Sequence, residues 1–285
     1  MLRDLAFVAI AALMFVAGLR ARPGALAAVL RDRSLIARAL AVNVIIVPLF
    51  GLAVVRTFAL ALPAAVGIML MALAPGVPLD ELAAGRKKGG SDALAVTLSF
   101  VMPAVSIVSV PLWLAVLAPA VGGALDIGRY VALALAFQLV PLLAGLEIRR
   151  RNERLASSLI RPVLAVAYVA LLALVVTLLV HEASAIGALL GTRTFAAILL
   201  LCVLNLAAGW FAGGPDVRNR DTLGIATVLR NIGLAAMMAT NFFGGAAVLA
   251  VVLGYLIVQA VVGTVAARFF VRHEAARPTA PPPAG

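Results

Sequence analysis

The sequence predicts an all-α, polytopic membrane protein with about nine transmembrane helices, and three observations point to this fold class. Of the 285 residues, 64% are hydrophobic and only 12% are charged, too apolar a composition for a soluble domain. The apolar residues occur in runs of about 20, the length that crosses a bilayer. Two of these runs are interrupted near mid-depth, at corresponding places in the two halves of the chain.

The expected membrane-spanning segments are separated by short connections that contain most of the charged residues. In the first half of the chain they cover residues 4–20, 34–56, 60–88, 92–117 and 126–147. In the second half they cover residues 157–180, 194–213, 221–242 and 245–270. We expect residues 1–273 to form a single transmembrane unit. Residues 274–285 are rich in proline, which does not continue a helix, and are expected to form a disordered tail.

The distribution of basic residues predicts the orientation of the chain. The net charge is +11, and 18 of the 23 Lys and Arg residues fall in the tail or in connections that share one side of the membrane. Because cytoplasmic loops carry an excess of Lys and Arg, we expect the amino terminus outside and the carboxyl terminus in the cytoplasm. The expected location is the plasma membrane, or the inner membrane of a prokaryote. We read the charge as a topology signal and expect no nucleic-acid partner.

The two interruptions are the strongest functional signal in the chain. The first is Pro75-Gly76-Val77-Pro78-Leu79-Asp80-Glu81 and the second is Arg230-Asn231-Ile232-Gly233. Together they bring two acids and one base to a depth where an ionisable group costs about 2.5–3.5 kcal/mol to insert, so these groups are candidates for function. Broken helices at matching positions are typical of the binding site of a secondary transporter.

Four segments of the chain resemble the bile acid:sodium symporter family in order and spacing. They are Met14–Leu19, Asn43–Leu49, Leu62–Met71 leading to Pro75-Gly76, and Asp221–Ala235. The resemblance runs along nearly the whole chain, and we expect a nine-helix member that lacks the extra first helix of the ten-helix members. It implies an inverted repeat with a panel domain and a core domain, in which the two broken helices cross. It also implies secondary transport of organic anions, usually driven by sodium.

The residues that bind sodium in that family are altered here. Asp80 and Glu81 stand where the family has serine and asparagine, Ala226 replaces a ligand glutamate, and Arg230 replaces a glutamine. A sodium ion requires oxygen ligands, whereas a guanidinium group is a cation with no lone pair to offer. We therefore expect no metal site and no sodium coupling through these positions.

Other positions keep a polar residue that matches a family ligand, namely Asn43, Ser99 and Asn231. With the residues that form the two breaks, they complete the set that we expect to bind substrate or ion: Asn43, Pro75, Gly76, Asp80, Glu81, Ser99, Arg230, Asn231 and Gly233.

Arg230 is expected to take the place of the missing cation. If both breaks lie at the same depth, its guanidinium can form a bidentate pair with Asp80 or Glu81. The remaining carboxyl group is then a candidate proton carrier. The alternative is that the pair only locks the crossed helices together.

The expected substrate is a small organic anion, because a half-helix that restarts in the membrane points N–H groups at its ligand and these favour anions. With Arg230 nearby, a carboxylate fits best, and transport is expected to be proton-coupled or uncoupled, with sodium as the second candidate for the coupling ion. Lipid is the other expected partner, and no cofactor is expected.

The alternatives are an auxin-efflux-type carrier, which also crosses two broken helices, and a non-transporting membrane sensor of the same fold. An enzyme is not expected, because no serine is paired with a base at suitable spacing.

Overall fold

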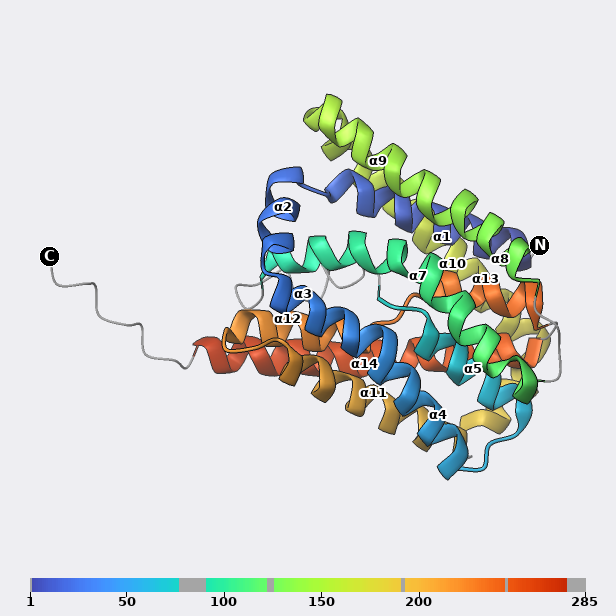
Figure 1. Ribbon diagram of the computed structural model, residues 1–285. Helices are drawn as coiled ribbons and strands as arrows, with labels where there is room; N and C mark the ends of the chain where they lie inside the picture. The colour runs from blue at the N-terminus through green and yellow to red at the C-terminus, as the bar shows by residue number, and fades with distance from the viewer. Residues whose placement is uncertain (1, 77–90, 122–125, 191–192, 244–245, 276–285) are drawn as a thin grey trace, which may run out of the picture.

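The computed structural model describes residues 2–76, 91–121, 126–190, 193–243 and 246–275, and in these ranges the chain is helical and contains no strand (Figure 1). The helices in the first half are α1 (Leu2–Arg20), α2 (Pro23–Arg31), α3 (Arg33–Ala41), the π-helical turn η1 (Val42–Ile46), α4 (Val47–Thr57), α5 (Leu62–Leu73) and α7 (Asp92–Val121). Those in the second half are α8 (Ile127–Ala134), the π-helical turn η2 (Leu135–Leu139), α9 (Val140–Arg151), α10 (Glu153–Leu190), α11 (Arg193–Ala212), α12 (Val217–Val228), α13 (Ile232–Phe242) and α14 (Ala246–Ala275).

These helices confirm the predicted fold class. Within the described ranges, eight helices are long and apolar enough to cross a membrane, and α5 is a shorter apolar helix of 12 residues. Together they match the nine predicted segments. α5 forms the first part of the predicted 60–88 segment, of which residues 77–90 lie outside the described part of the chain, as do residues 276–285 of the predicted tail. Helix α14 extends to Ala275, slightly beyond the predicted end of the transmembrane unit.

A π-helical turn joins α3 to α4 and another joins α8 to α9, and in each case the turn is followed by Val-Pro. Proline has no N–H, so Pro48 cannot donate to the carbonyl of Val44 in the usual i to i−4 pattern. The indole Nε1 of Trp113 on α7 donates to this carbonyl instead, at 2.7 Å. The turn η1 carries the buried Asn43, and η2 carries the buried Gln138. π-Helical turns of this kind often occur at functional sites.

The helices pack as two groups. In the first group, α1 lies against α9 and α10, and α8 continues through η2 into α9. The close contact between α1 and α9 depends on Gly18 and Gly145, where an added Cβ would meet the backbone of the other helix. The second group contains α3, α4, α5, α7, α11, α12, α13 and α14. The groups meet where α1 packs on α13 and where α10 packs on α14.

The outer surface of the bundle is apolar, as lipid contact requires. Large hydrophobic side chains are exposed along α7, α10 and α14, including Val116 at 69%, Val169 at 66% and Val265 at 62%. In Figure 1 α1 begins at one end of the bundle and α14 ends at the other. The nine segments predicted from the sequence, an odd number, require this arrangement. Which end faces the cytoplasm remains a prediction from the basic residues.

Candidate functional site

The end of α5 meets the interruption between α12 and α13. α12 ends at Val228, and residues 229–231 are non-helical before α13 begins at Ile232. The backbone N–H of Asn231 donates to the carbonyl of Ala74, just beyond the end of α5, at 3.1 Å. This hydrogen bond pairs the N–H of Asn231 with the carbonyl of Ala74, two groups that lie outside the helices. Backbone groups buried in a membrane need such partners.

Gly76 allows the first break to approach the second. A Cβ on this residue would lie 2.6 Å from the carbonyl oxygens of both Ala226 and Leu229, at the end of α12. Only glycine fits this contact, because real Cβ atoms do not approach backbone so closely. Pro75 precedes it, is buried, and follows the last turn of α5. Both residues therefore lie directly after the end of α5, and their role in forming a break stays a prediction.

Arg230 lies at this meeting point and is 1% exposed. Its Nη1 donates to Oδ1 of Asn43 at 2.7 Å, its Nε to the carbonyl of Met71 at 3.1 Å, and its Nη2 to the carbonyl of Ala72 at 2.6 Å. Met71 and Ala72 are in the last turn of α5, whose end carries a partial negative charge. The guanidinium thus caps the carboxyl-terminal end of one half-helix while its backbone belongs to the other break.

Asn43 connects the π-helical turn η1 to the second interrupted helix. Its side chain is 2% exposed. Its Oδ1 accepts from Arg230, while its Nδ2 donates to Oγ1 of Thr227 at 3.3 Å and to the carbonyl of Ala39 at 3.0 Å. The predicted site residues Asn43 and Arg230 are therefore in direct contact.

Gln259 on α14 holds the backbone of the second break, a role that the sequence analysis did not identify. Its Oε1 accepts from the backbone N–H of Arg230 at 2.8 Å, and its Nε2 donates to the carbonyl of Arg230 at 3.4 Å. The residue is 1% exposed. A polar residue within an apolar span was the available signal, the same one that indicated Asn43.

The remaining predicted residues are more loosely connected. Asn231 is 0% exposed and caps α13, its Oδ1 accepting from the N–H of Leu234 at 2.9 Å. Gly233 lies against Ile10 of α1, so it packs at the contact between the two helix groups. Ser99 is buried on α7, but within the described residues no hydrogen bond joins its hydroxyl to the breaks.

The acids Asp80 and Glu81 lie outside the residues that the structure describes. Their pairing with Arg230 therefore stays a prediction, and so does the role of either acid as a proton carrier.

A second polar pair is buried in the same helix group. Nδ2 of Asn205 on α11 donates to the hydroxyl of Tyr255 on α14 at 3.1 Å, and both residues are 0% exposed. Tyr255 lies one helical turn before Gln259 on the same helix, so α14 carries polar contacts to both α11 and the second break.

Fold and site together define a polytopic helical membrane protein in which the end of α5 and the interruption between α12 and α13 meet around a buried cationic side chain. A sequence profile described as the Sodium Bile acid symporter family matches residues 7–189, more than half of the chain. The protein belongs to this family of transporters. None of the curated proteins matches the chain. The family match favours the bile acid:sodium symporter interpretation over an auxin-efflux-type carrier.

Proposed function

We propose that this protein is a secondary active transporter of a small organic anion, with a carboxylate as the recognised group, and that it does not couple transport to sodium through the family's usual ligands. The observation that carries the proposal is the guanidinium of Arg230, buried among oxygen atoms where the two broken helices meet.

The oxygen atoms around Arg230 are of the kind that bind a metal cation. They comprise a side-chain amide oxygen from Asn43 and two backbone carbonyls from the end of α5. Oxygens of these types bind hard cations such as sodium and calcium. Here they accept hydrogen bonds from a cation that is covalently part of the chain. A sodium ion beside the guanidinium would be repelled, which supports a carrier that is independent of sodium at this position.

The amide of Asn231 supports an anionic substrate. Its Nδ2 is buried and has no hydrogen-bond partner among the described residues. Buried donors in native structures nearly always have a partner, so an unsatisfied donor calls for a ligand or a water molecule. It lies at the start of α13, where the helix dipole also favours negative charge. A carboxylate oxygen satisfies both requirements.

The driving ion that fits this proposal is the proton. With the charge of Arg230 fixed at the crossing, Asp80 or Glu81 balances it and the other acid is available to bind a proton. The proposal predicts that a proton gradient, and not a sodium gradient, drives uptake.

The test is uptake of radiolabelled carboxylates into proteoliposomes that contain the purified protein. The substrate is first selected by a thermal-shift screen against a panel of carboxylates, because a ligand that binds only the folded state raises the melting temperature. Asp80→Asn and Glu81→Gln are compared with Glu147→Gln, which neutralises a partly exposed acid away from the crossing. We expect accumulation against a gradient to be lost in one of the first two variants and retained in the third.

Three results would contradict the proposal. Uptake that follows a sodium gradient would disprove sodium independence. Uptake that a protonophore does not affect, and that neither acid variant changes, would leave the acids with a structural role. Carboxylate binding without any uptake would favour the non-transporting sensor.

A further inference from the structure

Helix α2 lies across the bundle at the end where α14 finishes, with its axis crosswise to α7 (Figure 1). It connects α1 of one helix group to α3 of the other. Leu26 and Leu30 are on its apolar face, and Arg22 and Arg31 are at its two ends. A short helix with one apolar face and basic ends, lying across the membrane-spanning helices, is typical of an element at the membrane surface.

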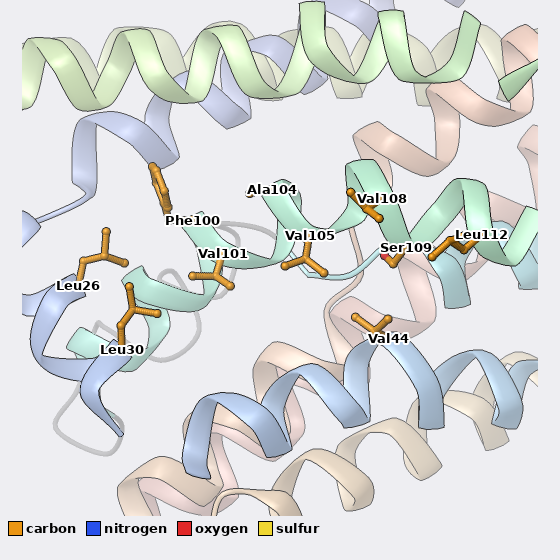
Figure 2. Close-up of a pocket in the computed structure, with 10 residues that line it drawn as sticks. All are labelled: Leu26, Leu30, Val44, Phe100, Val101, Ala104, Val105, Val108, Ser109 and Leu112. Atoms are coloured by element: carbon orange, nitrogen blue, oxygen red, sulfur yellow. The ribbon is translucent and has the colours of Figure 1, made fainter. Parts of the chain in front are cut away.

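The apolar face of α2 closes one end of a groove between α7 and η1 (Figure 2). The groove has a volume of about 580 Å³, and Leu26 and Leu30 line it together with Val44 and residues of α7 from Phe100 to Leu112. All lining residues are apolar except Ser109. Val108 and Leu112 are 64% and 63% exposed, so the groove opens at the outer surface. Such a groove accommodates a hydrocarbon chain.

A second pocket, of about 420 Å³ and lined mainly by charged residues, lies at the beginning of the same helix. Its lining includes Arg22 and Gly24 of the α2 region, and Arg149, Arg150 and Glu153 from the connection between α9 and α10. Arg149 donates to Glu153 at 2.6 Å, so these two charges balance. Arg22 and Arg150 give the pocket a net positive charge.

Arg150 is held only weakly by the protein. Its Nη1 lies 3.8 Å from Glu147, whose other carboxylate oxygen accepts from Arg151 at 2.6 Å, and the Arg150 side chain is 64% exposed. Arg22 has no ion pair with any other described residue. Both guanidinium groups can therefore turn to a phosphate without breaking a strong ion pair.

We propose that the pocket and the groove form one binding site for an anionic phospholipid, with its phosphate between Arg22 and Arg150 and one acyl chain against α2 and α7. Helix α2 contributes to both parts, so a bound lipid would tie the connection between the two helix groups to α7. A lipid is favoured over a partner helix because the site combines a cationic pocket at the membrane surface with an apolar groove at membrane depth.

The test compares phosphatidylglycerol with phosphatidylcholine of the same acyl chains, titrated into the detergent-purified full-length protein. Lipid binding is followed by native mass spectrometry and by the melting temperature. We expect phosphatidylglycerol to bind more tightly and to raise the melting temperature more. In the double variant Arg22→Gln/Arg150→Gln, the preference for phosphatidylglycerol over phosphatidylcholine should fall by about fivefold for each arginine removed. One basic residue near an anionic lipid surface contributes about this factor to binding.

Two controls separate the proposed site from a general attraction to the positively charged surface. Arg33→Gln/Arg161→Gln removes the same charge from exposed residues that line neither cavity and should keep the preference. Arg22→Lys/Arg150→Lys should retain most of it. The proposal is overturned if both glutamine variants lose the preference equally, if the two lipids bind alike, or if inorganic phosphate alone reproduces the stabilisation.

Discussion

The burial of Arg230 is possible because its guanidinium donates hydrogen bonds to the side-chain oxygen of Asn43 and to backbone carbonyls at the end of α5. A charged group in the membrane interior is costly unless it is paired and hydrogen-bonded. The contacts are supplied by Asn43 and by the end of α5, where the carbonyls would otherwise lack donors. The arginine and the half-helix therefore satisfy each other, and removing one leaves the other buried and unsatisfied.

This mutual dependence predicts the effect of substitution at Arg230. Arg230→Ala should destabilise the protein strongly, by about 3–5 kcal/mol, the usual cost of leaving one member of a buried charged contact without its partner. Arg230→Gln, which restores the family residue and retains a donor, should cost less. The measurement is the melting temperature in detergent. Arg161→Ala, at an exposed arginine on α10, is the control and should change it little. Equal effects of the three variants would contradict this account.

A second prediction concerns sodium. Replacing choline with sodium at equal ionic strength should not raise the melting temperature of the wild-type protein, because Arg230 occupies a cation position and Ala226 supplies no carboxylate. The double variant Ala226→Glu/Arg230→Gln restores both family residues and should gain a sodium-dependent rise. A sodium-specific rise in the wild-type protein would show that a sodium site remains.

At the residue scale, the sequence indicated the site through polar residues in apolar spans. Arg230, Asn43 and Asn231 are recognisable in this way, and the structure places them at the meeting of the two breaks. Gln259 carried the same signal. The carbonyls of Met71 and Ala72 carried none, because any residue supplies a carbonyl and only the three-dimensional arrangement brings these two to Arg230.

At the scale of the elements, the membrane-spanning segments were predictable and the finer features were not. The hydrophobic thickness of a bilayer requires about 20 apolar residues, so a span can be identified from its length alone. Helix α2 has only nine residues, too few to cross a bilayer, so the sequence predicts a connection at this place. The π-helical turns depend on a missing N–H at proline and on donors such as Trp113 from other helices, which local sequence does not specify.

The contact between the two breaks predicts that Gly76 cannot be replaced. Gly76→Ala places a methyl group against two backbone carbonyls of the α12 end, and backbone cannot rotate away as a side chain does. We expect a loss of about 1–3 kcal/mol, as for other overpacked sites. Gly254→Ala on α14 is the matched control, because no atom lies within 4 Å of an added Cβ there. It should be neutral or slightly stabilising, since alanine favours a helix more than glycine. A melting temperature that is the same for both variants would rule out the tight contact.

At the scale of the whole molecule, the sequence could not show which helices pack together. The grouping of α1 with α9 and α10 depends on shape at positions such as Gly18 and Gly145, and small residues are common throughout membrane helices. The number of spans and their order along the chain follow from the bilayer. The contacts that hold the two groups together follow from side-chain packing.

The two groups also touch at the end of the molecule where α8 begins. The guanidinium of Arg129 on α8 lies 5.7 Å from the ring centre of Phe242 on α13, and the hydroxyl of Tyr130 donates to the carbonyl of Ser106 on α7 at 3.2 Å. If transport proceeds by rocking of one helix group against the other, as expected for a carrier with a central site, these contacts must open during each cycle.

This mechanism predicts that a crosslink between the groups stops transport, whereas a crosslink within one group does not. In a Cys202→Ala background, which removes the chain's single cysteine, Arg129→Cys/Phe242→Cys joined by a short bis-maleimide should abolish uptake in proteoliposomes. Phe7→Cys/Phe137→Cys is the matched control. These rings stack at 4.1 Å between α1 and η2 of the same group, so their relative position should not change. Both variants should transport before crosslinking. Uptake that survives the Arg129–Phe242 crosslink would mean that the two helix groups do not separate at this contact during transport.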